Sequence, residues 1–177
     1  MDLREMLEEE GHEVVGEARD GAEAVALACD LAPDAVFMDV KMPGTDGLDA
    51  ARAIGERCPA AVVMVTAFSQ AEVVRSAAEA GAMAYVVKPF EKKDVIPALH
   101  VAVSRFAEAR ELEEQVSDLA ERLETRKALD RAKGVLMERG LSEPEAFRRL
   151  RRLAMDKRLT LRQVAEAVLL ASEAEEG

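Results

Sequence analysis

The sequence predicts an α/β unit with a parallel sheet, followed by an all-α unit of three helices. Short apolar runs alternate with helical patterns in the first part of the chain, and the pattern is helical throughout from Asp94 onward. The apolar runs lack the polar alternation of a sheet with one wet face, so we expect helices on both faces of a parallel sheet. A length of 177 residues suits one ordinary domain or two small ones.

Four segments of the first unit are predicted as strands. Three of them are apolar throughout, as buried strands are, at 35–38, 61–65 and 84–87. The fourth, at 13–18, mixes valine and alanine with glutamate and is a short strand. Helical patterns separate the strands and cover residues 21–31, 47–57 and 70–80.

Three polar residues, Asp39, Thr66 and Lys88, each follow directly on an apolar strand. The carboxyl ends of parallel strands meet at one edge of a sheet, where open α/β sheets bind their ligands. At that edge Asp39 can act as a nucleophile and form an acyl phosphate. Lys88 can pair with the phosphoryl oxygens, and the Thr66 hydroxyl can donate a hydrogen bond to them. The three residues together predict a phosphoryl-accepting site.

The surroundings of these residues resemble the receiver domains of two-component response regulators. The resemblance lies in residues 38–47 (MDVKMPGTDG), 65–67 (VTA) and 81–90 (GAMAYVVKPF). We assign residues 1–104 to a receiver domain on this basis. The resemblance implies that a sensor histidine kinase supplies the phosphoryl group to Asp39.

The resemblance implies three further features of the site. Mg²⁺ would bind beside Asp39, with the backbone carbonyl of Lys41 as a second ligand. Tyr85 would rotate as an aromatic switch when Thr66 moves, and the alternative for Tyr85 is a half-buried ring with a solvated hydroxyl. The Lys88–Pro89 peptide bond would be cis.

The chain departs from the receiver pattern at its start. Receiver domains begin with an apolar strand and two acidic residues that hold Mg²⁺, whereas this sequence opens in the following helix, at residues 2–7. In the flavodoxin-like strand order 2-1-3-4-5, the missing strand would lie between 13–18 and 35–38 and leave unpaired backbone groups on both. We expect the natural product to start upstream of Met1. The alternative is a degenerate receiver that works without phosphorylation.

Charge divides the chain into parts of opposite sign. The formal net charge is −11, yet residues 126–165 carry 12 Lys+Arg against 5 Asp+Glu, which gives +7 for that segment. The acidic remainder and the basic segment therefore suit different partners, and a basic segment of this kind is typical of nucleic-acid binding.

Residues 105–124 are predicted as a helical linker. Leu112, Val116, Leu119 and Leu123 are spaced by 4, 3 and 4 positions, which is the a/d seam of a coiled coil. The seam predicts either a homodimer through the linker helix or a helix that leans on its own output domain.

Three helices are predicted after the linker. The first covers 126–139 and ends at Gly140, a residue type that favours helix ends. The second begins at Ser142 and the third at Thr160, and each has a glutamate or glutamine three residues later, which is a capping box. Matching apolar faces on the three helices predict a small bundle.

The C-terminal sequence resembles the ANTAR domain of antitermination regulators, and we assign residues 125–177 to such a domain. The resemblance lies in residues 126–137, which contain Ala-Lys-Gly, in 146–156 and in 161–168. It implies that the domain binds RNA stem-loops and prevents a transcription terminator from forming.

The candidate RNA contacts are basic and lie off the apolar helix faces. Phe147 is expected on the core face, so arginine guanidinium planes would have to replace aromatic rings in base stacking. The alternative is a basic helix face that is merely solvated. The candidates are Arg126, Lys127, Lys133, Arg148, Arg149, Arg152, Lys157 and Arg158.

Other functions are less favoured by the sequence. A DNA-binding response regulator is the main alternative, and a protein-binding adaptor is another. No cluster of histidine, cysteine or acidic residues indicates an enzymatic output. Cys29 and Cys58 are isolated in the sequence and are expected as reduced thiols in a cytoplasmic protein. We expect neither a secretory signal nor a membrane span.

Overall fold

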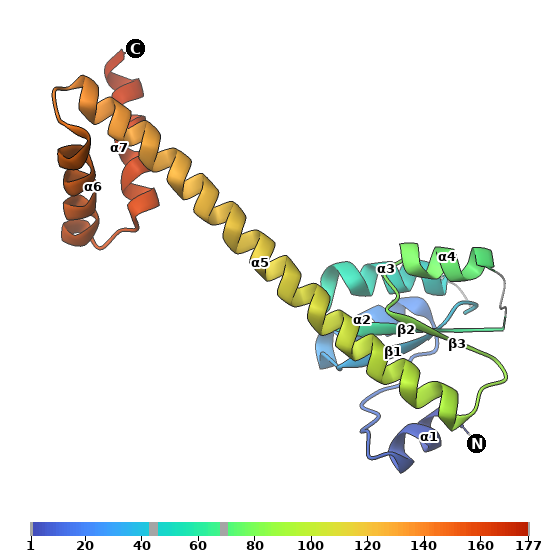
Figure 1. The fold of residues 1–177 in the computed structure, drawn as a ribbon. Helices are drawn as coiled ribbons and strands as arrows, with labels where there is room; N and C mark the ends of the chain where they lie inside the picture. The colour runs from blue at the N-terminus through green and yellow to red at the C-terminus, as the bar shows by residue number, and fades with distance from the viewer. Residues whose placement is uncertain (1, 43–45, 68–70, 177) are drawn as a thin grey trace. The chain divides into compact units, whose positions relative to one another are not determined.

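The computed structural model describes residues 2–42, 46–67 and 71–176. It divides into two compact units, Met1–Glu111 and Leu112–Gly177. One helix, α5 (Lys92–Glu138), contributes its first half to the first unit and its second half to the other (Figure 1). The boundary falls inside the segment that the sequence predicts as a linker.

The first unit is built on a parallel three-stranded sheet of order β1-β2-β3. The strands are β1 (Ala35–Asp39), β2 (Ala61–Thr66) and β3 (Ala84–Val87). Every residue of β2 is buried, as expected for the central strand of a sheet that is covered on both faces. The three apolar runs are thus confirmed as neighbouring parallel strands.

Helices cover both faces of this sheet (Figure 1). One core packs Ile54 and other residues of the middle helices against Met38 and Met64 of the sheet. The opposite core packs Met6 and Val95 against Val63 and Val86. The helices of the first core are α2 (Gly21–Leu31), α3 (Gly47–Arg57) and α4 (Ala71–Glu79), and those of the second are α1 (Leu3–Glu9) and the start of α5. Gln70, where the third helix was predicted to begin, lies outside the described residues.

The predicted strand at 13–18 is wrong, because this segment forms no strand in the structure. A strand needs a backbone partner, and the strand that would pair with this segment in the receiver order is missing from the chain. Val14 still packs against the core formed by α1 and α5. A cavity of about 540 Å³ lies between this segment, α2 and the free edge of β1. The gap expected from the missing strand is therefore present beside β1.

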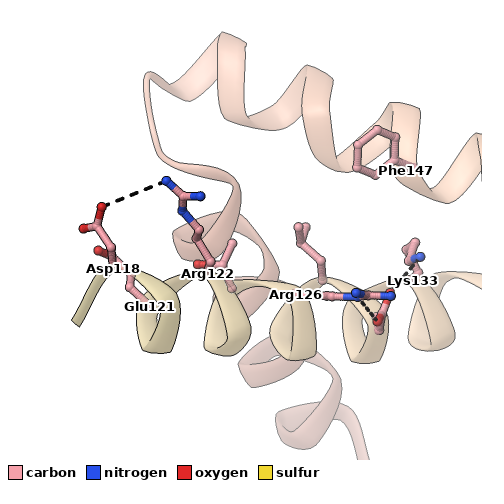
Figure 2. A pocket seen from close by; sticks show the side chains of 9 residues that line it. Asp118, Glu121, Arg122, Arg126, Lys133 and Phe147 are labelled. Atoms are coloured by element: carbon pink, nitrogen blue, oxygen red, sulfur yellow. Dashed lines mark ion pairs between the residues drawn. The ribbon is translucent and has the colours of Figure 1, made fainter. Parts of the chain in front are cut away.

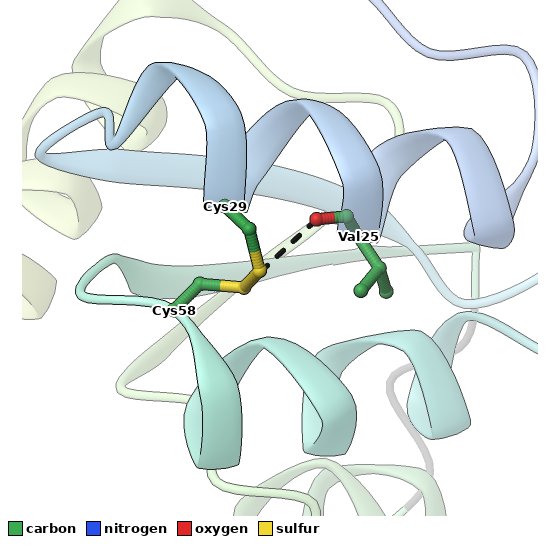
Figure 3. The surroundings of a disulfide bond; sticks show 3 residues. All are labelled: Val25, Cys29 and Cys58. Atoms are coloured by element: carbon green, nitrogen blue, oxygen red, sulfur yellow. Dashed lines mark hydrogen bonds between the residues drawn. A yellow bond between two sulfur atoms is a disulfide. The ribbon is translucent and has the colours of Figure 1, made fainter.

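The two cysteines form a disulfide bond, so the expectation of two reduced thiols is wrong (Figure 3). Cys29 lies in α2 and Cys58 directly follows α3, and their Cα atoms are 4.8 Å apart. The two helices pack side by side in the tertiary structure. Their sequence separation of 29 residues gave no sign of this proximity.

The second unit is a bundle formed by the end of α5 with α6 (Glu143–Lys157) and α7 (Leu161–Glu176). Its core includes Leu136, Leu150 and Ala165. Both predicted capping boxes are present, with Glu145 bonded back to Ser142 and Gln163 to Thr160. Gly140 has a positive φ of 93° where α5 ends, as a C′ glycine does. The three-helix output unit is confirmed, with its first helix continuous with the linker.

The predicted linker seam lies on α5 within the second unit. Leu112, Val116, Leu119 and Leu123 are each more than half exposed. None of them belongs to the described core of the bundle.

Across the described ranges, no helix is both long enough and apolar enough to span a membrane.

Candidate functional site

The three predicted site residues of the receiver unit meet at the carboxyl edge of the sheet. Asp39 ends β1 beside Val65, and Thr66 ends β2 beside Val87. Lys88 follows β3, and its backbone N–H donates to the carbonyl of Thr66 at 2.7 Å. The parallel register thus places the carboxylate, the hydroxyl-bearing residue and the ammonium on adjacent strand ends.

The side chain of Asp39 is held from two directions. Its Oδ2 forms an ion pair with the Lys88 ammonium. Its Oδ1 accepts a hydrogen bond from the backbone N–H of Lys41 at 3.1 Å. Both members of the ion pair keep about a third or more of their side chains exposed, so the carboxylate remains accessible from solvent. The Lys88–Pro89 bond is cis, as the receiver resemblance implied.

Gly47 packs directly against the backbone of Asp39 and is absent from the residues predicted above. A Cβ atom at this position would overlap the carbonyl oxygen of Asp39 and lie 3.0 Å from the Cα atom of Val40. The Gly47 N–H also donates to the Val40 carbonyl at 3.1 Å. The sequence signals for this role are its place at the end of the receiver-like segment 38–47 and at the first position of the predicted helix 47–57. Residues 43–45 of that loop lie outside the described residues.

The predicted switch residues differ in their environments. Thr66 is buried, with 2% of its surface exposed, whereas Tyr85 on β3 is 48% exposed. In the strand register Tyr85 is paired with Met64, two residues before Thr66. The buried hydroxyl-bearing residue and the exposed ring therefore lie on neighbouring strands near the same edge.

The oxygen donors beside Asp39 meet only the lower limit of what Mg²⁺ uses in proteins. Mg²⁺ is commonly held by one or two carboxylates together with water and phosphate oxygens. The site offers the Asp39 carboxylate, and the receiver resemblance adds the Lys41 carbonyl as an expected second ligand. Within 2–42, 46–67 and 71–176, no group of three histidine, cysteine or acidic side chains is placed to hold a metal ion.

The basic residues predicted as RNA contacts are exposed in the second unit, with the exception of Lys133. The Lys133 ammonium pairs with Asp130 at 2.8 Å and Glu143 at 2.9 Å, and its side chain is only 19% exposed. Hydrogen bonds to Asp130 and Glu143 raise the pKa of Lys133. This residue therefore joins the end of α5 to the start of α6.

Three of the remaining candidates form ion pairs between side chains that are more than half exposed. Arg126 lies 4.0 Å from Asp130, and Arg152 lies 3.7 Å from Asp156. Lys127 pairs with Glu124 at 2.8 Å. Arg148 donates to the carbonyl of Pro144 at 3.3 Å, while Arg149, Lys157 and Arg158 are exposed at or near the surface of α6.

The structure brings Arg126 and Lys133 together at a pocket that also contains Phe147 (Figure 2). Phe147 is 40% exposed, so its expected place on the core face is wrong. The buried stripe of α6 is narrow and consists of Ala146, Leu150 and Ala154, which leaves Phe147 at its border. The pocket has a volume of about 490 Å³. Its lining residues are Asp118, Glu121, Arg122, Thr125, Arg126, Leu129, Asp130, Lys133 and Phe147.

Comparison with protein families assigns both units. A family model for the response regulator receiver domain matches residues 1–100, and one for the ANTAR domain matches residues 117–169. The transcriptional regulatory protein PdtaR of Mycobacterium tuberculosis is 57% identical over 170 residues, which is 96% of this chain and 83% of PdtaR. The chemotaxis protein CheY of Thermotoga maritima is 40% identical over 101 residues, which is 56% of this chain and 84% of CheY.

Solved structures match the first unit. The response regulator domain of Thermotoga maritima CheB has a TM-score of 0.53 and 27% identity, and the match covers 58% of this chain and 85% of that one. A CheX–CheY–BeF3–Mg²⁺ complex from Borrelia burgdorferi has a TM-score of 0.52 and 30% identity, over 55% of this chain and 75% of that one. The three-stranded sheet thus has the arrangement of CheY-like domains.

Proposed function

Because the chain belongs to the response regulators that join a receiver domain to an ANTAR domain, we propose that it accepts a phosphoryl group on Asp39 and regulates transcription by binding RNA stem-loops. The phosphoryl donor is a sensor histidine kinase, and the RNA-bound output domain prevents a terminator from forming. Phosphoryl transfer and RNA binding both take place in the cytoplasm. The observation that carries the proposal is the meeting of Asp39, Thr66 and Lys88 at one sheet edge.

The proposed transfer uses the side chains at that edge. A carboxylate oxygen of Asp39 attacks the phosphorus of the kinase phosphohistidine, so an oxygen–phosphorus bond forms as the nitrogen–phosphorus bond breaks. The imidazole leaves with the electron pair of that bond. The Lys88 ammonium, already paired with Asp39, is within reach of the phosphoryl oxygens. Thr66 then donates its hydroxyl proton in a hydrogen bond to the same group, and Tyr85 responds on the neighbouring strand.

Mg²⁺ is the cofactor of the proposed site. The Asp39 carboxylate and the Lys41 carbonyl would hold it, and the ion would offset the negative charge of the phosphoryl oxygens. The hydrogen bond that the Lys41 backbone N–H donates to Asp39 Oδ1 orients the carboxylate for this role.

RNA binding is supported by the charge and exposure of the second unit. The segment 126–165 carries a net charge of +7, and arginines 148, 149, 151 and 152 are all exposed on α6. Phosphate contacts by such residues supply sequence-independent affinity that falls as salt rises. Folded RNA is recognised through its shape and its unpaired loops, which suits a compact helical surface better than a groove-reading helix.

Two measurements on the full chain test the proposal. Intact mass after incubation with Mg²⁺ and a small phosphodonor is expected to show one added phosphoryl group, and Asp39→Asn is expected to show none. Fluorescence anisotropy is expected to show tighter binding to an RNA hairpin than to duplex DNA of the same sequence. Arg149→Ala/Arg152→Ala should weaken RNA binding, whereas Arg57→Ala in the receiver unit should not. Preference for duplex DNA would favour a DNA-binding regulator instead.

A phosphorylation-independent RNA binder is the second candidate function. Two observations favour it: among the residues that the structure describes, no group of three histidine, cysteine or acidic side chains is placed to hold a metal ion, and a cavity lies beside β1. Unchanged mass with every phosphodonor, together with RNA binding that Asp39→Asn leaves intact, would support this candidate.

Self-association through the linker helix is part of the proposal. The stripe of Leu112, Val116, Leu119 and Leu123 is exposed and has heptad spacing. Packing of this seam against the same seam of a second copy would remove apolar surface from water.

A further inference from the structure

The pocket of the second unit combines an aromatic face with a balanced set of charges. The Phe147 ring extends from α6 toward the face of α5 that carries Arg126 and Lys133 (Figure 2). The volume of about 490 Å³ falls within the range of small-ligand sites, roughly 300–1,000 Å³. The narrow buried stripe of α6 leaves the Phe147 ring half exposed at this pocket, where its face is open to a ligand.

The charges at the pocket exclude a simple phosphate site. Three carboxylates line it, and three cations offset them, so the pocket is close to neutral. A phosphate group would meet the carboxylates and be repelled, whereas the exposed Arg149 and Arg151 on α6 lie outside this acidic lining. The carboxylates are those of Asp118, Glu121 and Asp130, and the cations are those of Arg122, Arg126 and Lys133.

A nucleobase matches this combination. Its flat face can stack on an aromatic ring, and its edge presents both hydrogen-bond donors and acceptors. Arg122 lies 4.0 Å from Asp118, and Arg126 lies 4.0 Å from Asp130. Both separations exceed hydrogen-bond length, so the two arginine side chains can turn to a base edge without breaking a short bond to these carboxylates, while Asp130 stays fixed by Lys133 at 2.8 Å.

We propose that this pocket takes one unpaired base of the bound RNA, stacked on Phe147 with its edge toward the carboxylates and guanidinium groups. The inference rests on RNA binding by the second unit and adds the place where a loop base is read. Only an unstacked base can enter, so the pocket selects RNA with a single-stranded loop over a fully paired duplex.

The test uses the full chain and a pool of RNA hairpins with a constant stem and a randomised loop. A hairpin enriched by binding to the unchanged protein serves as the probe. Its loop nucleotides are then replaced one at a time by abasic residues, which keep the phosphate and remove the base. Phe147→Ala is compared with Met155→Ala, an exposed apolar residue on the same helix. Phe147→Trp supplies the sole indole of a chain that has no tryptophan.

Phe147→Ala is expected to weaken hairpin binding by about tenfold or more, and Met155→Ala should leave it unchanged. One abasic position should cause a similar loss in the unchanged protein and no further loss in Phe147→Ala. The indole of Phe147→Trp should be quenched by the intact hairpin but not by the hairpin that is abasic at that position.

The contrary results separate a failure of the base site from a failure of RNA binding as a whole. If no hairpin is enriched, RNA binding fails and the base site fails with it. If hairpins bind, but Phe147→Ala binds as tightly and the indole is not quenched, the base site alone is overturned. A loss in Phe147→Ala that adds to every abasic loss also overturns it, because Phe147 would then act only on the packing of α6. Circular dichroism of each variant confirms that the helices remain folded.

Discussion

Gly47 at the start of α3 lies so close to Asp39 that its missing side chain leaves room for the Asp39 carbonyl oxygen. Asp39, the proposed phosphoacceptor, is therefore positioned by the helix after its loop as well as by the strand before it. The backbone N–H of Gly47 also closes the loop by donating to Val40. Because any side chain at position 47 would collide with Asp39, the observed geometry of Asp39 requires glycine there.

We predict that Gly47→Ala will destabilise the receiver unit by about 1–3 kcal/mol, as overpacking of a filled site does. It should also slow phosphorylation of Asp39, since the backbone of either residue must shift. Gly55→Ala is the matched control on the same helix, because a Cβ there meets nothing within 4 Å. That control should be neutral or slightly stabilising. Equal urea midpoints and phosphorylation rates for the two variants would contradict the prediction.

The disulfide between Cys29 and Cys58 closes a loop with a sequence separation of 29 residues. Restriction of the unfolded chain by such a loop is worth about 2–4 kcal/mol. We expect a thiol reductant to lower the free energy of unfolding of the receiver unit by that amount. Cys29→Ala/Cys58→Ala should unfold at the lower midpoint with or without reductant. An unchanged midpoint for the native chain, with both thiols shown to be free by alkylation, would count against this role.

The capping box of α6 predicts a pH dependence for the second unit. Hydrogen bonds from the Ser142 side chain and backbone hold the pKa of Glu145 below its usual value of 4.5. A carboxylate with a lowered folded pKa stabilises the fold above its unfolded pKa and loses that contribution as pH falls through the folded value. Glu145→Gln should therefore be less stable than the native chain near pH 7, and the difference should shrink as the pH falls below 4.5 and through the lowered folded pKa. Thermal unfolding followed by circular dichroism measures this difference, and a gap that stays constant with pH would oppose the prediction.

The exposed seam of α5 predicts a dimer that one substitution abolishes. Leu119→Lys places a charge in the middle of the seam, and Ser117→Lys adds the same charge to the helix outside the seam. Sedimentation velocity should show a concentration-dependent dimer for the native chain and for Ser117→Lys, and a monomer for Leu119→Lys. A native chain that sediments as a monomer at every concentration would rule out association through this seam.

Much of the receiver site was predictable because parallel strands place their carboxyl ends at one edge. Asp39, Thr66 and Lys88 follow strands whose apolar character is plain in the sequence, so their proximity needed no long-range information. The role of Gly47 was not predictable in the same way, since it depends on the path of a loop. The disulfide depended on the packing of α2 against α3, which neither helix records in its own sequence.

In the second unit, too, local features were predictable from the sequence and tertiary contacts were not. Capping residues act within a few positions of one another, so Ser142 and Thr160 marked the helix starts correctly. The exposure of Phe147 depends on how wide a stripe α6 buries, and that width is set by the neighbouring helices. The engagement of Lys133 by Glu143 likewise depends on how α5 and α6 meet.

The cavity beside β1 leads to the last prediction. It is lined by apolar side chains such as Val14, Leu27 and Met38, and it borders backbone that lacks a strand partner. An apolar segment of about five residues followed by two acidic residues, fused ahead of Asp2, should enter this space as a strand. Backbone amides at 13–18 and along β1 should then become protected from hydrogen exchange, because both gain a partner.

The same extension should raise phosphorylation of Asp39 in Mg²⁺, since the added carboxylates supply further oxygen donors beside the Asp39 carboxylate. An extension with asparagines in place of the two acids separates the two effects. It should protect the amides equally, because the strand is intact, but it should leave phosphorylation at the level of the unextended chain. Protection without any gain in phosphorylation from the acidic form would mean that Asp39 and Lys41 already suffice for the metal. A lack of protection in both forms would show that the cavity does not accept a strand.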